Sequence, residues 1–162
     1  MTDLEVEVVR SEKRKRTMQA YIVDGKLRVL VPAGLPQEQE SKLVETMIAR
    51  ANRKLSSAGV DLMGRATQLA TKYRLPTPAS AEWSDRQQAR WGSCTSSEGR
   101  IRISNRLASM PGWVLDWVLV HELAHLEEAN HGERFQALAG RYELGERAKG
   151  YLIAKSEERA SF

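Results

Sequence analysis

Histidine and cysteine are scarce in this chain, which has three histidines and one cysteine among 162 residues. The single cysteine, Cys94, excludes a disulfide within the chain. Long apolar runs are missing too. None approaches the roughly 20 residues of a membrane span, and the opening stretch MTDLEVEVVR lacks the apolar core of a signal peptide. We therefore expect a cytoplasmic protein that has no contact with a membrane.

Excess charge is confined to one short stretch. The net charge of the chain is +4, and RSEKRKR (10–16) carries five basic residues and one acidic residue, so this stretch accounts for all of it. A solvated loop, a nucleic-acid patch and a partner-binding site are the possible interpretations. No aromatic side chain on which bases could stack adjoins the stretch. A solvated loop is therefore favoured, and association with DNA stays an alternative.

Alternating apolar residues predict three strands in residues 1–35, arranged as a β-meander. Asp24-Gly25 between the last two strands is typical of a two-residue hairpin turn, because both turn positions need a positive φ. The alternating residues are Leu4, Val6 and Val8, then Met18, Ala20 and Ile22, then Leu27, Val29 and Val31.

Helical periodicity follows in residues 36–75, strand-like patterns in 80–108 and helices again in 111–152. This order predicts a single α+β domain over residues 1–162. The expected buried positions are Leu43, Met47, Ala51 and Leu55, flanked by Val44 and Ile48, in the first helix. In the second helix they are Leu62, Ala66, Leu69 and Tyr73. In a last helix near 132–151 they are Phe135, Leu138, Tyr142 and Leu144.

All three histidines lie within HELAHLEEANH (121–131). A helix advances about 100° and 1.5 Å per residue, so His121 and His125 project from one face, one turn apart. Glu122 lies at the rim of the same site, where it can reach a water rather than the metal. Two histidines and a glutamate in H-E-x-x-H are the two zinc ligands and general base of a metalloprotease.

A catalytic zinc needs a third protein ligand. Glu128 shares the helix face, but three ligands at this spacing would span about 10.5 Å, too long for bonds near 2 Å. His131 can reach the metal only if the helix stops, and Asn130 and Gly132 predict a stop. We predict His131 as the third ligand, with Glu128 or a downstream glutamate such as Glu143 as alternatives.

The spacing of the three histidines also occurs in metzincins, H-E-x-x-H-x-x-G-x-x-H. Here Glu128 occupies the glycine position, and no methionine follows Met110 to form the downstream Met-turn. The metzincin assignment is therefore disfavoured.

Several segments together resemble the YgjP-like metallopeptidases, relatives of the SprT-like and WLM zinc proteases. They are ARWGSC, RIRISNRL and VLVHELAHLEEANHGERF, with RSEKRKRT and the hairpin that follows it. The resemblance covers most of the chain and implies a minimal zincin-like domain, in which a small antiparallel sheet packs on the active-site helix. It implies Zn²⁺ held by His121, His125 and His131, with Glu122 as the catalytic residue.

We therefore expect a zinc metalloendopeptidase that cleaves peptide bonds by a zinc-activated water, with Glu122 as the general base. Its partners would be peptide or protein substrates. The SprT-like relatives are associated with proteolysis of DNA-bound proteins, which lends some support to a DNA association. The alternative is a non-catalytic metal-binding or nucleic-acid-associated module that retains the zincin fold.

Other residues near the motif have open roles. Arg90 and Tyr142 are candidates for stabilising the oxyanion. Cys94 is interpreted as a packing residue, because it lacks a C-x-x-C partner, and Gly92 as a point of close approach in a strand. RIRISNRL is either an edge strand that binds an extended peptide or a central strand with no free edge.

Overall fold

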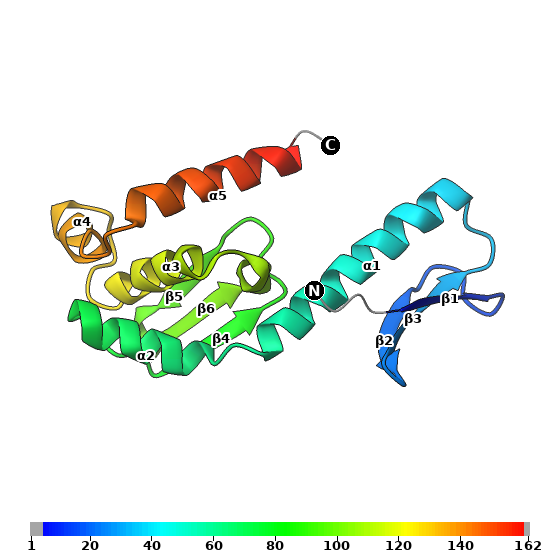
Figure 1. The fold of residues 1–162 in the computed structure, drawn as a ribbon, viewed down its shortest axis with the longest axis horizontal. Coiled ribbons are helices and arrows are strands. Elements are labelled where there is room, and N and C mark those ends of the chain that lie inside the picture. The colour runs from blue at the N-terminus through cyan, green and yellow to red at the C-terminus, as the bar shows by residue number, and fades with distance from the viewer. Residues whose placement is uncertain (1–4, 161–162) are drawn as a thin grey trace. The chain divides into compact units, whose positions relative to one another are not determined.

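The structure is a computed structural model that describes the backbone of residues 5–160 and the side chains of residues 5–157. The chain divides into two compact units, Met1–Leu55 and Ser56–Phe162, and each is described here by itself. Helices and strands alternate in groups, which confirms the α+β class (Figure 1). The expectation of one domain over residues 1–162 stays a prediction. Leu4, expected in the first strand, lies outside the described residues.

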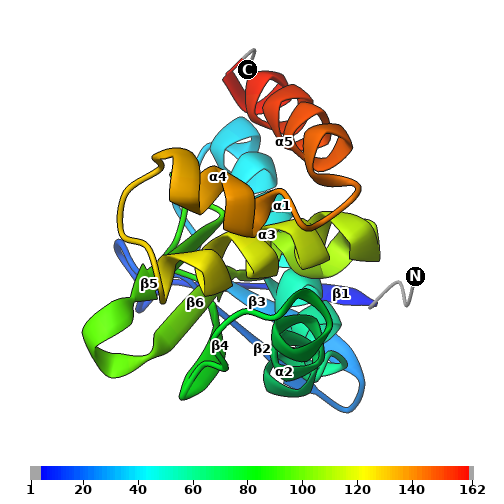
Figure 2. The ribbon, with the colours of Figure 1, turned by 90° about the vertical axis from the view of Figure 1, so that its left-hand side faces the viewer.

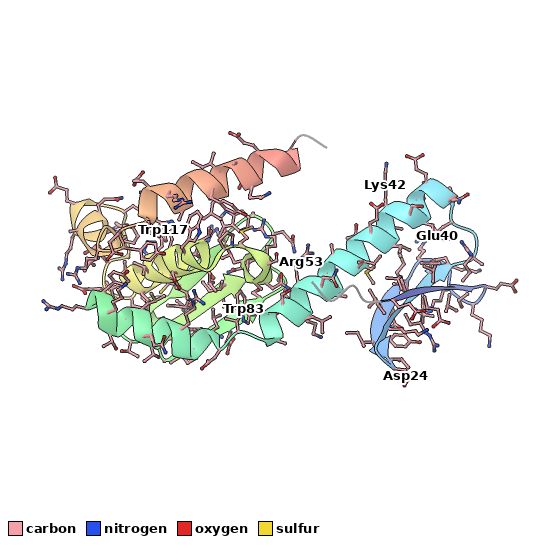
Figure 3. The ribbon with its side chains drawn as sticks, in the orientation of Figure 1. Asp24, Glu40, Lys42, Arg53, Trp83 and Trp117 are labelled. Atoms are coloured by element: carbon pink, nitrogen blue, oxygen red, sulfur yellow. The ribbon has the colours of Figure 1, made fainter. Side chains whose placement is uncertain are left out.

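The first unit contains a three-stranded sheet of β1 (Val6–Ser11), β2 (Gln19–Val23) and β3 (Lys26–Pro32). Asp24 (φ 52°) and Gly25 (φ 76°) form the predicted hairpin turn between β2 and β3 (Figure 3). The predicted meander is wrong, however, because the strand order is β1-β3-β2 and β1 pairs with β3 in parallel. The most apolar strand takes the centre, where Leu27, Val29 and Val31 are at most 1% exposed.

Helix α1 (Gln37–Ala58) covers the core of the first unit with a different stripe from the one expected. Leu43 and Leu55 are exposed, because residues four apart drift around the helix by about 40° per step. A stripe that follows the 3.6-residue period stays on one face instead. The side chains of α1 that pack on β3 are Val44, Met47, Ile48 and Ala51.

The basic stretch 10–16 begins in β1 and continues as a loop. Arg10 forms two hydrogen bonds with the Glu40 carboxylate, at 2.6 and 3.0 Å, and Arg14 donates to the Gln19 side chain at 2.8 Å. Lys13, Lys15 and Arg16 are exposed to solvent. DNA association of this loop stays a prediction.

The second unit contains a sheet of β4 (Ser80–Ser84), β5 (Gly92–Thr95) and β6 (Arg100–Ser104), in the order β4-β6-β5. Strand β6 pairs with β5 in antiparallel and with β4 in parallel, so the sheet is mixed rather than antiparallel as expected. Ile101 and Ile103 in β6 are 0% exposed, which explains its central place. RIRISNRL is therefore a central strand, and β5 is an edge strand.

Helices α2 (Leu62–Tyr73) and α3 (Gly112–His125) contact this sheet, and α4 (Glu133–Ala139) and α5 (Gly145–Ala160) contact α3 from the side away from it (Figure 2). Helix α3 is thus buried on all sides, as a helix with apolar residues around its whole circumference must be. The four predicted apolar residues of α2 are buried. No helix in the described part of the chain is long and apolar enough to span a membrane.

The expected last helix is broken into α4 and α5 by a turn over residues 140–144. Phe135, Leu138 and Tyr142 are buried as predicted, whereas Leu144 is exposed. At Gly145, where α5 begins, an added Cβ would lie 3.0 Å from the Trp117 ring. The chain therefore passes very close to α3 at this point, and a continuous helix would not follow the same path.

The burial of α3 predicts that its side chains contribute strongly to the stability of the second unit. Leu123→Ala removes a side chain that is 0% exposed, and should lower the free energy of unfolding by about 2–5 kcal/mol. Leu144→Ala, at a leucine that is 39% exposed, should change it by only about 0.5 kcal/mol. All four tryptophans lie within Ser56–Phe162, so urea unfolding followed by tryptophan fluorescence reports on this unit. Equal effects of the two substitutions would contradict the assignment of α3 as the core element.

Candidate metal centre

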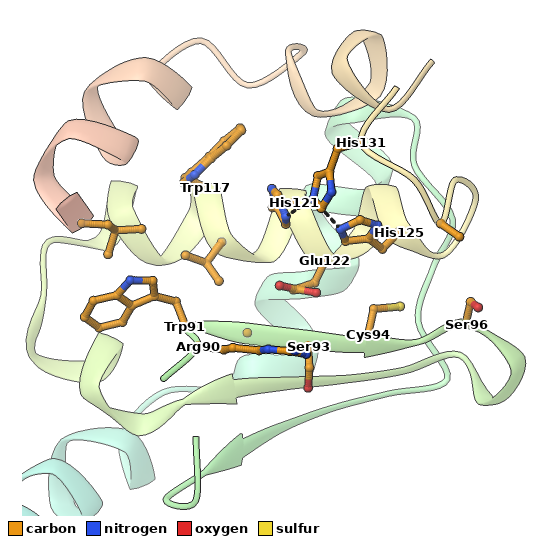
Figure 4. Close-up of a pocket in the computed structure, with 14 residues that line it drawn as sticks. Arg90, Trp91, Ser93, Cys94, Ser96, Trp117, His121, Glu122, His125 and His131 are labelled. Carbon is orange, nitrogen blue, oxygen red and sulfur yellow. Dashed lines mark hydrogen bonds between the residues drawn. The ribbon is translucent and has the colours of Figure 1, made fainter. Parts of the chain in front are cut away.

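A cavity of about 620 Å³ lies beside the C-terminal half of α3. Its helix side carries His121, Glu122 and His125, and its strand side carries the start of β5 and the residues just before it (Figure 4). His131 closes one part of it from the loop that precedes α4. The predicted residues therefore share one cavity, although they come from separate elements.

The three histidines turn their Nε2 atoms toward one point. The Nε2 atom of His131 lies 3.1 Å from that of His125 and 3.2 Å from that of His121. Four ligands at about 2.05 Å from a tetrahedral zinc ion would be about 3.3 Å from one another. Two of the three separations match this value, and all three ligand atoms lie within 4.8 Å of one another, so the side chains could hold one metal ion. Among the described residues they form the one group of this kind. Their role as ligands stays a prediction.

The third histidine reaches this point because α3 ends at His125. The amides of Leu126 and Glu127 donate to carbonyls three residues back, at 3.1 Å each, which tightens the last turn. The expected reason for the stop was different. Neither Asn130 nor Gly132 has a positive φ, so no left-handed residue ends this helix.

Neither alternative ligand belongs to the group. The backbone carbonyl of Glu128 accepts a hydrogen bond from Nδ1 of His125 at 3.0 Å, and its carboxylate lies 3.8 Å from Arg134. The carboxylate of Glu143 accepts a hydrogen bond from the Tyr73 hydroxyl at 2.8 Å. Because Nδ1 of His125 carries the proton, its Nε2 has a free lone pair, as a metal ligand requires.

Phe135 supports all three imidazoles from one side. Its ring centroid lies 4.9 Å from that of His121, 4.4 Å from that of His125 and 4.6 Å from that of His131. Phe135 is only 1% exposed, so the first turn of α4 fixes it firmly. The three ligand candidates therefore rest on a rigid apolar surface rather than on one another.

The surroundings of His121 and His125 lower the pKa of both imidazoles and so favour their neutral form. Burial, together with the smaller effects of His125, His131 and Lys149, lowers the pKa of His121 to about 4. Burial also lowers the pKa of His125, against the raising effect of its hydrogen bond to Glu128. Neutral imidazoles are the form that binds a metal ion, so the site favours a cation at neutral pH.

Glu122 is buried on the strand side of the triad and is 6% exposed. Burial raises the pKa of its carboxyl to about 7, and the nearby charge of Arg90 opposes this shift. A carboxyl with such a pKa can both accept and return a proton near neutrality.

Gly92 provides the space for this carboxylate. A Cβ added at Gly92 would lie 2.6 Å from Oε1 of Glu122 and 2.8 Å from its Cγ. Only glycine therefore allows β5 to pass this close to Glu122 without moving the carboxylate. The close approach that the sequence indicated at Gly92 is made to Glu122.

The other candidate residues from the sequence differ in whether they line the cavity. Arg90 lines the cavity, whereas Tyr142 does not and donates instead to the Trp113 carbonyl at 2.8 Å. Cys94 lines the cavity but is not part of the histidine group. Burial, together with the charge of Glu122, raises the pKa of its thiol to about 11, so it stays protonated and unreactive.

The geometry makes a direct prediction about His131. His131→Ala should weaken zinc binding by at least about 100-fold, because a two-nitrogen site remains, and even the loss of an outer partner costs about 10–100-fold. Glu128→Ala is the matched control, since it removes the carboxylate but keeps the carbonyl that accepts from His125. Zinc affinity is measured by competition with a chromogenic chelator. Unchanged affinity of the His131 variant would show that another group supplies the third bond.

Comparison with known proteins identifies the family of this chain. A family model described as YgjP-like, metallopeptidase domain matches residues 3–143. Neither the curated proteins nor the solved structures compared with the chain gave a match. The matched range includes the three histidines and Glu122, and the description implies a metal-dependent hydrolase that cleaves peptide bonds. The chain belongs to the YgjP-like metallopeptidase family.

Proposed function

We propose that the protein is a zinc-dependent endopeptidase that uses His121, His125 and His131 as metal ligands and Glu122 as the general base. One observation carries the proposal: three imidazoles that could hold a metal ion lie beside a buried carboxylate in an open cavity. Three nitrogen ligands favour zinc and leave the fourth position for water and substrate. A non-catalytic module with the same fold would have no need of a buried carboxylate.

Zinc at this site would polarise the scissile carbonyl and lower the pKa of a water molecule bound beside it. Glu122 accepts the proton as the water attacks and passes it to the nitrogen of the leaving amine. Its pKa of about 7, raised by burial, suits both steps, because the proton is neither held too weakly nor too strongly at neutral pH.

Arg90 is the candidate for stabilising negative charge on the carbonyl oxygen. It lines the cavity next to Glu122 and acts on the carboxyl through its charge. A guanidinium offers several N–H donors and stays protonated. An oxygen that becomes negative in this cavity would gain a charge-assisted hydrogen bond from Arg90.

Strand β5 offers a way to bind the peptide backbone. The Ser104 amide donates to the Trp91 carbonyl at 2.8 Å, so the bonds to β6 fall on every second residue from Trp91 onward. The backbone groups of Gly92 and Cys94 then point to the other side, where β5 has no strand partner among the described residues. An extended substrate can add there as a further strand. The sequence suggested RIRISNRL as a possible edge strand for binding an extended peptide. We propose that β5 has this role instead.

Glu122→Gln tests the mechanism. The amide is almost isosteric and leaves the histidines untouched, so zinc content and fold should be retained. Cleavage of an unfolded protein substrate should fall by about 10²–10⁴-fold, because the amide cannot accept the proton. Glu127→Gln is the control, as Glu127 is exposed and pairs with Arg134. Zinc content and fragment yield are measured for each variant, with and without a chelator. Equal cleavage by the parent and by zinc-loaded Glu122→Gln would refute the mechanism.

Gly92→Ala tests whether the position of the carboxylate matters. The added methyl group would push Glu122 away by a fraction of an ångström to about 1 Å, and a displacement of that size can cost about 100-fold in rate. Zinc affinity should be unchanged, because the methyl group meets Glu122 and none of the histidines. Gly150→Ala is the control, because a Cβ at Gly150 has no atom within 4 Å. A rate for Gly92→Ala equal to that of the control would rule out this role of Gly92.

A further inference from the structure

The cavity continues past His121 into an apolar end. Its lining there consists of Trp91, Trp117, Val118 and Leu152, which together are called the tryptophan end below. Figure 4 shows Trp91 and Trp117 on one side of the His121–Glu122 pair, with Cys94 and Ser96 on the other side. Trp117 connects this end to the metal centre, because its ring packs edge-on against His121 at 5.8 Å between centroids. Neither the three histidines nor Glu122 needs this space for its own role.

The walls of the tryptophan end are held in place by contacts outside the cavity. The guanidinium of Arg106 stacks on the Trp91 ring at 3.9 Å from its centroid. The same guanidinium donates to the Arg90 carbonyl and to the Ser104 hydroxyl, at 3.0 Å each. Stacking and hydrogen bonding together fix the plane of the Trp91 ring. The apolar end is therefore formed before any ligand arrives, as small-molecule sites usually are.

Helix α5 forms one wall of this end. Leu152 lines the cavity from α5, and Nζ of Lys149 lies 5.1 Å from the centre of the Trp117 ring. The family model matches residues 3–143, so this wall comes from a part of the chain beyond the matched domain. Ile153, the next residue of α5, is 59% exposed and faces away. The helix thus presents one apolar residue to the cavity and one to solvent.

The charges around the tryptophan end are positive. Arg90 lines the cavity, and Nζ of Lys149 lies 5.1 Å from the centre of the Trp117 ring, so two cations adjoin this space. Lys149 also pairs with the exposed Glu146 at 2.6 Å. Among the residues that the structure describes, Glu122 is the one carboxylate in the cavity lining, and the proposed reaction uses it. A lysine or arginine side chain entering this end would meet cations and an apolar wall without a partner, which is unfavourable.

We infer that the tryptophan end is the subsite for a large apolar substrate side chain next to the scissile bond, with Leu152 of α5 as a specificity-determining residue. The inference rests on the proposed peptidase function and adds the class of residue at which cleavage occurs. Two aromatic walls and two aliphatic side chains favour leucine, phenylalanine and tryptophan side chains. Lysine and arginine are excluded by Arg90 and Lys149.

Cleavage preference tests the inference. A set of unstructured peptides that differ at one position is digested by the zinc-loaded parent, and the kcat/KM values are compared. The parent should cleave beside leucine or an aromatic residue at least about tenfold faster than beside lysine, since apolar pockets discriminate by about 10–200-fold. Leu152→Ala should raise the ratio of kcat/KM for the tryptophan peptide to kcat/KM for the leucine peptide several-fold, because it enlarges the subsite. Leu152→Phe should lower that ratio, and Ile153→Ala should leave it unchanged.

Opposite shifts by the two Leu152 variants would not arise from a loss of stability, which lowers all rates together. Cleavage without any preference, or the same ratio in Leu152→Ala, Leu152→Phe and Ile153→Ala, would overturn the subsite and leave the peptidase proposal standing.

Binding provides a readout that needs no cleavage. Acetohydroxamic acid and the hydroxamic acids of N-acetyl-leucine, N-acetyl-tryptophan and N-acetyl-lysine are titrated into the zinc-loaded protein by calorimetry. The leucine and tryptophan probes should bind at least about tenfold more tightly than the lysine probe, and Leu152→Ala should change their order. Preference in binding without cleavage of any peptide would support the subsite and refute the peptidase. Equal affinity for all four probes would overturn the subsite.

Discussion

The end of helix α3 at His125 is the constraint on which the rest of the site depends. A helix that continued to His131 would carry this residue about 240° around the axis from His125, with its imidazole on another face. The chain instead leaves the helix, and α4 then brings Phe135 under all three imidazoles. The arrangement of the three histidines therefore depends on the end of a helix, which backbone hydrogen bonds stabilise without any bound ion.

Burial of α3 has a second effect on chemistry. The sheet covers one side of the helix and α4 and α5 cover the other, so its polar groups are largely buried. This raises the pKa of Glu122 and lowers that of His121. Both shifts have the same physical cause, which is the cost of placing charge in an apolar environment. The same packing that stabilises the fold thus favours neutral His121 and His125 and gives Glu122 a pKa of about 7, as the proposed general base would need.

Local patterns in the sequence predicted local geometry well. The spacing of His121 and His125, the Asp24-Gly25 turn and the buried face of α2 follow from backbone periodicity alone. Strand order was predicted less well, because pairing of β3 between β1 and β2 depends on competition between distant segments for the buried position. Leu152 was missed for a similar reason: an apolar residue in a helix does not reveal whether it faces a core or a cavity. The end of the helix after His125 was predicted. The left-handed residue that was expected to end it is absent, because neither Asn130 nor Gly132 has a positive φ.

A peptide added to β5 must present its backbone in extended form, and the edge that would receive it is only four residues long. Folded proteins hide both their backbone hydrogen-bonding groups and their large apolar side chains. A substrate of the proposed peptidase would therefore be a protein in which a segment has opened, even briefly. For such substrates, turnover would follow the free energy of local unfolding of the target more closely than its sequence. The four-residue edge of β5 would then distinguish unfolded segments from folded ones, and stably folded proteins would be spared without any inhibitor.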